Sequence, residues 1–445
     1  MMTKEEIIKD AKEHNVYYIR LSFTDINGMI KNVEIPFRKL EAALNNEIMF
    51  DGSSIDGFAR IHEADMYLRP DLNTWVVLPF EKDQYGTIAN LTCDVYLPNG
   101  EPFEGDPRYV LKRNIEKLKE FGHEYFKVGV EPEFFLFHMD ENKNITLNPN
   151  DHGNYFDMAP IDGAENCRRE IVLELEKLNF KMEASHHEAA PGQHEINFEF
   201  HDALEAADKL QLFKIVVKKV ARRHNLHATF MPKPVDSVNG SGMHVNASIS
   251  DREGNNVFFD PKGNYDGLSQ TMEHFIAGLI KHARAFTAIT NPIVNSYKRL
   301  VPGYEAPSYI SWSDDNRSVM IRIPTSRGKG TRAEVRSADP SSNPYLALAV
   351  ILASGLDGIK NKENLMKPVY INLYDLDRDT RESMGIKNLP ENLKDALKEL
   401  KRDDVVKDAL GKHVFDKFYS AKKFEWESYR KSVTDWEVNH YLKTM

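Results

Sequence analysis

Pairs of glutamates in this chain have the spacing of residues that could hold a cation. Glu131 and Glu133 flank Pro132 in a strand pattern whose alternate positions are apolar, so both carboxylates project from the face opposite the core. Glu188 precedes a short loop, and Glu195 begins a second alternating strand. Two parallel acids one strand repeat apart repel each other unless a positive charge lies between them. The pattern therefore indicates cation binding, with a solvated strand face as the alternative for any single pair.

Two further segments place groups suited to metal and phosphate on one strand face. The first follows the flexible turn Asn239-Gly240-Ser241-Gly242 and alternates three polar residues with apolar ones: His244, Asn246 and Ser248. The second sets a glutamate between two arginines: Arg332, Glu334 and Arg336. Guanidinium groups match phosphate oxygens, but the same composition suits a surface salt-bridge strip. A lone strand histidine is also usually structural, so each segment alone is a weak signal.

Together these segments supply an oxygen-rich ligand set. It comprises five glutamates and one histidine: Glu131, Glu133, Glu188, Glu195, Glu334 and His244. Such a set suits Mg²⁺ or Mn²⁺ better than zinc, which prefers sulfur and nitrogen. The chain has neither a Gly-x-x-x-x-Gly-Lys-Ser/Thr loop nor a Gly-x-Gly-x-x-Gly after a strand. A bound nucleotide would therefore have to be held by metals and arginines.

The first hundred residues predict a small domain that precedes these groups. A capping box from Thr3 to Glu6 begins a short helix, and an Asn27-Gly28 turn then joins two strand patterns into a hairpin. After further strands, Asp106-Pro107 has the form of an N-cap followed by proline in the first helical turn. We therefore expect residues 1–103 to form the first domain and residues 104–445 the second.

The second domain mixes strands with long helices. Its helical patterns cover residues 165–178, 203–224, 268–286, 343–359 and the region after 391. A chain of 445 residues is too long for one ordinary core and long enough for two or three. The strands that carry the acids must therefore be positioned by a large helical layer.

Composition narrows the class of protein. The formal net charge is -10 and there is no lysine or arginine block, which argues against a nucleic-acid partner. No apolar run approaches the length of a membrane span, and the charged start does not read as a secretory signal. The two cysteines, Cys93 and Cys167, are far apart, which argues against a disulfide framework or a cysteine zinc site. We expect a cytoplasmic, reducing location.

Separated motifs along the chain resemble bacterial type I glutamine synthetase in order and spacing. They are Met49 to Ser54, Glu131 to Phe135, His187-Glu188 with Gly192 to Glu195, Asn239 to His244, Lys298 to Pro307, and Arg332 to Arg336. The resemblance runs from about residue 16 to the C-terminus. It implies an α+β fold, with a small β-grasp-like N-terminal domain and a large α/β catalytic domain. The curved antiparallel sheet of the large domain would form active sites between subunits.

The resemblance implies ATP-dependent ligation of ammonia to L-glutamate through γ-glutamyl phosphate, with two or three Mg²⁺ or Mn²⁺ ions per active site. One metal would be held by Glu133, Glu188 and Glu195, and the metal that bridges the ATP phosphates by Glu131, His244 and Glu334. Glutamate would contact Asn239, Gly240, Arg299, Glu305 and Arg336. ATP would contact Ser248, Arg317, Arg322 and Arg332. Asn246 departs from the enteric relatives, which carry a second histidine there.

The same resemblance assigns catalytic roles to Asp51, Glu305, Arg317 and Arg336. Asp51, contributed by a neighbouring subunit, would bind ammonium and accept its proton, whereas composition alone reads it as part of a simple turn. Glu305 lies in a proline-flanked loop that would close over the reactive acyl phosphate and exclude water. The subunits would form a homo-dodecamer of two hexameric rings. The helical C-terminus would serve as an inter-ring clasp or pack as an ordinary core element.

Regulatory features resemble the feedback-inhibited branch of low-GC Gram-positive bacteria. Arg60 matches a position tied there to glutamine feedback, and such relatives also bind nitrogen-responsive transcription factors. Tyr374 resembles the tyrosine that is adenylylated in the other branch, but the residues after it differ, and we interpret it as a surface-loop tyrosine. The alternatives are a glutamate–polyamine ligase of the same fold, a phosphotransferase with a related site, and a non-catalytic nitrogen-regulatory oligomer.

Overall fold

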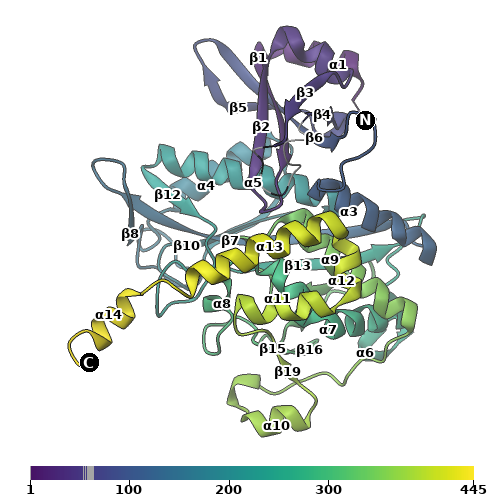
Figure 1. Ribbon diagram of the computed structural model, residues 1–445, viewed down its shortest axis with the longest axis vertical. Helices are drawn as coiled ribbons and strands as arrows, with labels where there is room; N and C mark the ends of the chain where they lie inside the picture. Colours follow the sequence, from purple (N-terminus) through teal and green to yellow (C-terminus); the bar gives the residue numbers. More distant parts are fainter. Residues whose placement is uncertain (1, 54, 56, 58–64) are drawn as a thin grey trace.

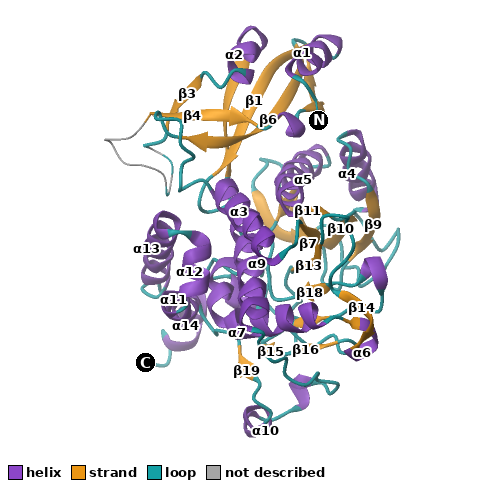
Figure 2. Ribbon diagram, turned by 90° about the vertical axis from the view of Figure 1, so that its right-hand side faces the viewer, coloured by secondary structure: helices purple, strands orange, loops and turns teal. Residues whose placement is uncertain are grey.

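The computed structural model describes residues 2–53, 55, 57 and 65–445. A small body that contains the N-terminus lies at one end of the long axis, above a larger body (Figure 1). A sheet fills the small body, and the C-terminal helices gather on one side of the strands of the large one (Figure 2). Each body has its own apolar core. This arrangement confirms the predicted α+β fold of a small and a large domain.

The small domain is built on one six-stranded sheet. Its elements are α1 (Lys4–Glu13), β1 (Val16–Thr24), β2 (Ile30–Pro36), α2 (Leu40–Leu44), β3 (Ile48–Asp51), β4 (Asp65–Pro70), β5 (Val76–Asp83) and β6 (Gly86–Tyr96). The strand order is β2-β1-β6-β4-β3, with β5 also paired to β6. The predicted capping box and hairpin are confirmed: Thr3 caps α1, and Gly28 turns β1 into β2 with a φ of +81°, a conformation that favours glycine.

One long strand, β7 (Tyr125–Met139), is the spine of the large domain. It pairs with β8 (Ile145–Pro149), β10 (Gln193–Phe198), β11 (His201–Asp202), β12 (Leu226–Thr229) and β13 (Met243–Ser250). The sheet continues from β10 to β9 (Met182–His187), and from β13 to β18 (Ala333–Val335), β17 (Ile321–Arg322) and β16 (Trp312–Ser313). Because β7 has partners on both sides, its side chains lie in the middle of the sheet.

Long helices form the main core against this sheet. They are α3 (Pro107–Glu116), α4 (Glu165–Lys177), α5 (Ala203–Arg223), α7 (Gln270–Thr290), α9 (Pro344–Asn361), α11 (Leu393–Arg402), α12 (Asp404–Leu410) and α13 (Lys412–Tyr429). The predicted helical ranges are thus confirmed. α7 and α9 approach closely, because a Cβ on Gly278 would lie 2.2 Å from the Ser354 carbonyl oxygen.

Short elements complete the large domain: α6 (Asn264–Gly267), α8 (Ser296–Arg299), α10 (Arg378–Ser383), α14 (Asp435–Tyr441), β14 (Phe259–Gly263), β15 (Tyr309–Ile310) and β19 (Lys387–Asn388). β15 pairs with β19, which anchors the excursion that carries α10. α14 projects away from the body at the C-terminus (Figure 1). Its apolar side chains are not packed as a core element would be: Trp436 is 58% exposed and Leu442, just after the helix, 76%.

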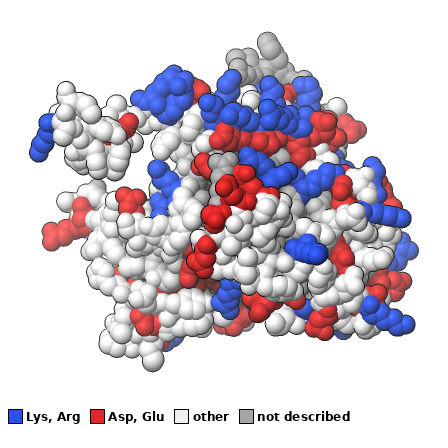
Figure 3. Space-filling view, turned by 90° about the horizontal axis from the view of Figure 1, so that it is seen from below, with Lys and Arg blue, Asp and Glu red and all other residues white. Residues whose placement is uncertain are grey.

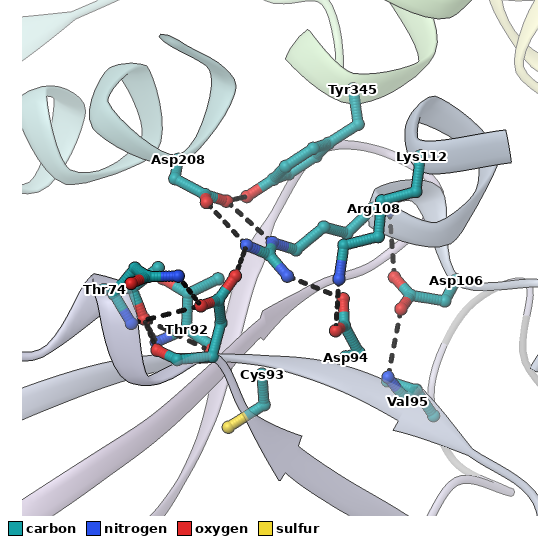
Figure 4. Close-up of polar contacts among 12 residues, drawn as sticks. Thr74, Thr92, Cys93, Asp94, Val95, Asp106, Arg108, Lys112, Asp208 and Tyr345 are labelled. Atoms are coloured by element: carbon teal, nitrogen blue, oxygen red, sulfur yellow. Dashed lines mark hydrogen bonds and ion pairs between the residues drawn. The ribbon is translucent and has the colours of Figure 1, made fainter. Parts of the chain in front are cut away.

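A buried ion network joins the two domains (Figure 4). Arg108, in the first turn of α3, has a side chain only 2% exposed and lies 2.6, 2.7 and 2.8 Å from carboxylate oxygens of Asp71, Asp94 and Asp208. Asp71 and Asp94 belong to the small domain and Asp208 to α5, where Tyr345 of α9 also donates a hydrogen bond to it at 2.7 Å. A buried cation is stable only when it is paired. The network therefore fixes how the small domain sits on the large one.

Two surface properties bear on the sequence predictions. Within the described part of the chain, no helix combines the length and apolar character of a membrane span. On the face seen from below, acidic and basic side chains are intermingled (Figure 3). This face differs from the continuous basic footprint that nucleic acid requires.

Candidate active site

Glu131, His244 and Glu334 meet where three neighbouring strands lie side by side. His244 on β13 is the register partner of Glu131 on β7, and β18 brings Glu334 to the other side of β13. His244 Nδ1 lies 3.1 Å from a Glu131 oxygen and 3.5 Å from a Glu334 oxygen. Burial opposes ionisation of Glu131, but hydrogen bonds from His244 and Asn246 and the His244 charge lower its pKa to about 2. The three side chains can together ligate one cation.

A second group of acids lies one strand repeat along β7. Glu133 is the register partner of Glu195 on β10, which is in turn the partner of His186 on β9. His186 lies 3.4 Å from a Glu188 oxygen and 3.6 Å from a Glu195 oxygen. Burial and repulsion from Glu188 and Glu195 raise the pKa of Glu133 well above its usual range, and burial and Glu195 raise the pKa of Glu188 to about 7. Acids that repel one another in this way are suited to a divalent cation.

His186 is a neighbour of this cluster that the sequence analysis missed. The motif that resembles the family begins at His187 and does not include His186. The buried ring of His187 bonds Asp151 at 2.8 Å and the backbone carbonyl of Glu188 at 2.6 Å. His187 therefore supports the chain that carries Glu188 and does not face the acids. Strand parity could have found His186, because residues 186 and 188 project to the same side of a strand.

A cavity of about 520 Å³ opens beside the first cluster, and Ser248, Arg332 and Glu131 are among its lining residues. Asn246 joins two of them: its Nδ2 donates to Glu131 Oε1 at 2.9 Å, and its Oδ1 accepts from Arg332 Nε at 2.9 Å. The alternating pattern that begins at Glu195 predicts an apolar face shared by Ile196, Phe198 and Phe200, and for Phe200 this prediction is wrong. β10 ends at Phe198, and Phe200 is 61% exposed and lines the cavity.

Two arginines hold Glu334 from opposite sides. Arg322 Nη1 donates to Glu334 Oε2 at 2.8 Å, and Arg336 Nη1 donates to Glu334 Oε1 at 2.9 Å. Guanidinium groups also bind phosphate oxygens in a fixed geometry. The first carboxylate cluster, its arginines and the cavity can therefore bind one phosphorylated ligand.

Comparison with known proteins decides the family. Residues 104–441 match the family model for the glutamine synthetase catalytic domain, and residues 15–98 match that for the glutamine synthetase beta-Grasp domain. The chain belongs to the glutamine synthetase family. It is therefore a ligase, and the resemblance inferred from the six motifs is confirmed. The family's use of ATP and divalent metal ions agrees with the two carboxylate clusters.

Relatives of the glutamine synthetase family span the whole chain. Curated glutamine synthetases of Staphylococcus aureus and Staphylococcus epidermidis are 57% identical over 441 residues, which cover 99% of this chain and 98% of each relative. A solved structure described as a GmaS/ADP complex has a TM-score of 0.88 at 33% identity, over 98% of this chain and 99% of that one. A Plasmodium falciparum glutamine synthetase has a TM-score of 0.87 at 25% identity, over 99% of both chains.

The loops expected to hold glutamate meet beside the second cluster. Asn239 Nδ2 donates to Glu305 Oε2 at 2.8 Å, which ties the turn before β13 to the loop at residues 302–307. Gly240 packs so closely that a Cβ there would lie 2.4 Å from the Pro232 carbonyl oxygen. Glu305 has a φ of +57°, a left-handed conformation that is strained for a residue with a side chain.

The structure places two other predicted arginines in different surroundings. Arg299 is 3% exposed and donates to the backbone carbonyls of residues 336 and 337, and its charge also acts on Glu133 of the second cluster. Arg317 is exposed, and its charge acts on Tyr155, whose pKa is raised by burial and by Glu188 and Glu195. Tyr155 is a further site neighbour that the sequence analysis missed. Little in the sequence indicated this position, because Tyr155 stands there only as an aromatic residue in a polar loop.

Asp51 and Arg60 lie apart from this arrangement. Asp51 ends β3, the edge strand of the small sheet, and its Oδ1 accepts a hydrogen bond from the backbone N–H of Ser53 at 2.8 Å. Its side chain is exposed, as expected for a group offered to another subunit. Arg60, the predicted feedback residue, falls outside the described residues.

Tyr374 lies in the short helical turn Leu373–Asp375 between loops, and it makes contacts that the sequence did not reveal. Its ring is half-buried, with its centroid 5.9 Å from that of Tyr309, and its hydroxyl donates to the Ala306 carbonyl at 2.6 Å. The segment that carries Tyr374 therefore contacts the loop that carries Glu305. A local sequence match could not reveal this contact, because the two residues are 68 positions apart.

Proposed function

We propose that this protein is a glutamine synthetase. It uses ATP to join ammonia to the side-chain carboxylate of L-glutamate through γ-glutamyl phosphate, and it releases L-glutamine, ADP and phosphate. One observation carries the proposal: the carboxylate clusters around Glu131 and Glu133 share one strand, with the cavity beside the first and the Asn239–Glu305 contact beside the second. A phosphate donor and a glutamate acceptor can then meet over a single row of acids.

The repulsion within the second cluster supports metal binding, since a cation would relieve it. Two Mg²⁺ or Mn²⁺ ions would be held by Glu131, His244 and Glu334, and by Glu133, Glu188 and Glu195. When bound, these ions would supply positive charge that offsets the charge developing on the transferred phosphoryl group. The expected number of two to three ions per active site allows one further ion beside these two.

The chain's own residues would bind and shield the reactants. Arg322, Arg332 and Arg336 surround the first cluster, where their guanidinium groups would hold ATP phosphates and steady the oxygens of the transferred phosphoryl group. Glu305 would cover the acyl phosphate, exclude water and take a proton from the ammonia adduct. Asp51 of a neighbouring subunit would bind ammonium and accept its proton.

The proposal extends to the whole assembly. We propose a homo-dodecamer in the cytoplasm, with a domain boundary between residues 103 and 104 that is consistent with the ranges of the two family matches. The exposed apolar side chains of α14 support a contact between rings. Arg60 as a feedback residue and binding of a nitrogen-responsive transcription factor stay predictions.

The test is to follow phosphate and glutamine together with purified oligomer, glutamate, ATP and Mg²⁺. Equal release of both products, only when ammonium is present, is the expected result. Turnover with methylamine or a polyamine, and none with ammonium, would instead identify a glutamate–amine ligase. An intact oligomer that shows no turnover with ammonium or with these amines would contradict an enzymatic role.

A further inference from the structure

The Glu305 loop, residues 302–307, is tied to surrounding segments by polar contacts and by a cation–π contact, and Ala306 packs into the main core. The Glu305 side chain accepts from Asn239 at 2.8 Å. The Tyr304 ring lies 3.8 Å from Lys233 Nζ, in cation–π geometry. A further polar contact reaches the loop backbone: the Tyr374 hydroxyl donates to the Ala306 carbonyl at 2.6 Å. This hydrogen bond is made directly next to the strained Glu305 residue.

Tyr374 reaches the loop from a firmly anchored segment. It lies in the short helical turn Leu373–Asp375, which Asn372 caps. Val369 donates to the Trp312 carbonyl at 3.0 Å, and Asn316 Nδ2 donates to the carbonyl of residue 371 at 2.7 Å. A small apolar cluster packs the segment in place: Tyr309, Val319, Val369, Leu373 and Ile386. The donor is therefore fixed, and its acceptor Ala306 is 2% exposed at the point where the loop returns to the main core, directly after the exposed Glu305.

The Tyr374 hydroxyl also lies within reach of the charges of the site. Burial raises the pKa of Tyr374, while the charges of Arg336 and Arg299 lower it and that of Glu305 raises it. The Tyr374 hydroxyl is therefore close enough to Arg336, Arg299 and Glu305 for their charges to act on it. Packing of the ring on Tyr309 would need no hydroxyl, so the hydroxyl itself requires an explanation.

We propose that Tyr374 is a positioning residue for the Glu305 loop. Its hydroxyl donates a hydrogen bond to the Ala306 carbonyl. This bond keeps the backbone of the neighbouring Glu305 left-handed, with the Glu305 carboxylate over the second cluster. The loop then stays closed while γ-glutamyl phosphate waits for ammonia. This inference rests on the proposed function, because it assigns Tyr374 to retention of that intermediate and not to its formation.

The experiment compares Tyr374→Phe with wild type at limiting ammonium, where the intermediate waits longest. Loss of one neutral hydrogen bond should increase the open fraction of the loop about fivefold. Phosphate release should then exceed glutamine formation, with the excess falling as ammonium rises, while the KM for ATP stays unchanged. The matched control is Tyr309→Phe, which removes a hydroxyl from the neighbouring ring of the same cluster and should leave the two products equal.

A second readout does not depend on turnover. Amide hydrogen exchange of the peptide spanning residues 303–308 should be faster in Tyr374→Phe than in wild type or Tyr309→Phe. Equal amounts of phosphate and glutamine from Tyr374→Phe at every ammonium concentration, or unchanged hydrogen exchange in this peptide, would overturn the inference. A wild-type protein that makes no glutamine with ammonium would instead contradict the proposed function, so the two failures are distinguishable.

Discussion

The second carboxylate cluster concentrates more negative charge than a buried site tolerates alone. Glu133 and Glu195 are 8% and 6% exposed, and Glu188 lies beside them. An ionised carboxylate in a low-dielectric site needs an opposite charge or hydrogen bonds. His186 and the amide of Gln193 supply part of this compensation. A divalent cation would supply the rest, so cation binding and the stability of this region should be coupled.

Chelation should therefore lower the thermal stability of the protein. A cation at 100 times its Kd adds about 2.7 kcal/mol to the free energy of unfolding, so EDTA should lower Tm and Mg²⁺ should restore it. Glu188→Gln should raise Tm in EDTA, because it removes one repelling charge, and should lose most of the Mg²⁺-dependent increase. Calorimetry measures both effects. Glu199→Gln, just after β10, is the control, and a Glu188→Gln protein with the full Mg²⁺ response would refute the assignment.

Asn246 offers a second test at the residue scale. It joins Glu131 to Arg332 through two charge-assisted hydrogen bonds, each 2.9 Å long. Asn246→Ala should leave the guanidinium of Arg332 held only by its bond to the Gly330 carbonyl and raise the KM for ATP about tenfold, as expected for loss of hydrogen bonds to charged groups. The KM for glutamate should stay within about twofold, which steady-state kinetics can establish. A selective rise in the glutamate KM would be the contrary outcome.

The residue types in the sequence predicted the acidic side chains of the site better than the side chains that surround and support them. The strand alternation of Glu131 and Glu133 and the motif around His244 pointed to groups that the structure brings together, with Glu131 beside His244 and Glu133 paired with Glu195. The sequence did not distinguish His186 from His187, because adjacent histidines differ only in the face that they occupy. The substrate contact of Arg299 stays a prediction: its guanidinium donates to backbone carbonyls that folding brings to it, and its charge acts on Glu133.

At the scale of elements, long helices were predictable and short strands were not. The cap at Asp106 and the apolar periodicity of α5 are local properties, so their ranges follow from the sequence. β16, β17 and β18 contain only two or three residues and exist because each pairs with a neighbouring edge: β18 with β13, β17 with β18, and β16 with β17. Their register, which carries Glu334 to His244, depends on residues far away in the chain.

A histidine that joins three helical segments predicts a pH-dependent stability. His282 on α7 contacts Asp403 at 2.6 Å and Asp357 of α9 at 2.9 Å, and Lys281 also pairs with Asp357. Burial opposes protonation of His282, but the two aspartates raise its pKa. The contribution of these ion pairs to the free energy of unfolding is therefore complete below the unfolded-state pKa of about 6.5. It is lost as the pH rises through the folded-state pKa of His282.

The measurement compares the Tm of wild type with that of His282→Gln. At pH 6 the variant should lose about 3 kcal/mol of stability, typical of removing one partner from a buried ion pair. The difference in Tm should narrow steadily as the pH rises toward 9. A difference that stays constant or widens over this range would contradict a charged His282 at low pH.

At the scale of the whole molecule, two exposed features bear on the proposed assembly. The ion network of Arg108 fixes the small domain on the large one, which holds the edge strand β3 in a defined direction. Asp51 at the end of that strand is exposed, and α14 carries exposed Trp436 and Val438. Exposed apolar groups on a projecting helix indicate a protein contact. The proposed oligomer would account for both features, with Asp51 completing a neighbour's active site and α14 in contact with the other ring.

Mixing two inactive variants tests this shared site. Asp51→Ala and Glu305→Ala oligomers should each make little glutamine. After dissociation and reassembly together at equal amounts, about a quarter of the sites should combine an intact Glu305 with an intact neighbouring Asp51, because each is drawn at random in a head-to-tail ring. Glutamine synthesis should recover to about a quarter of the wild-type rate. Variants reassembled separately are the controls, and no recovery from mixed oligomers of normal size would place both residues in the site of a single chain.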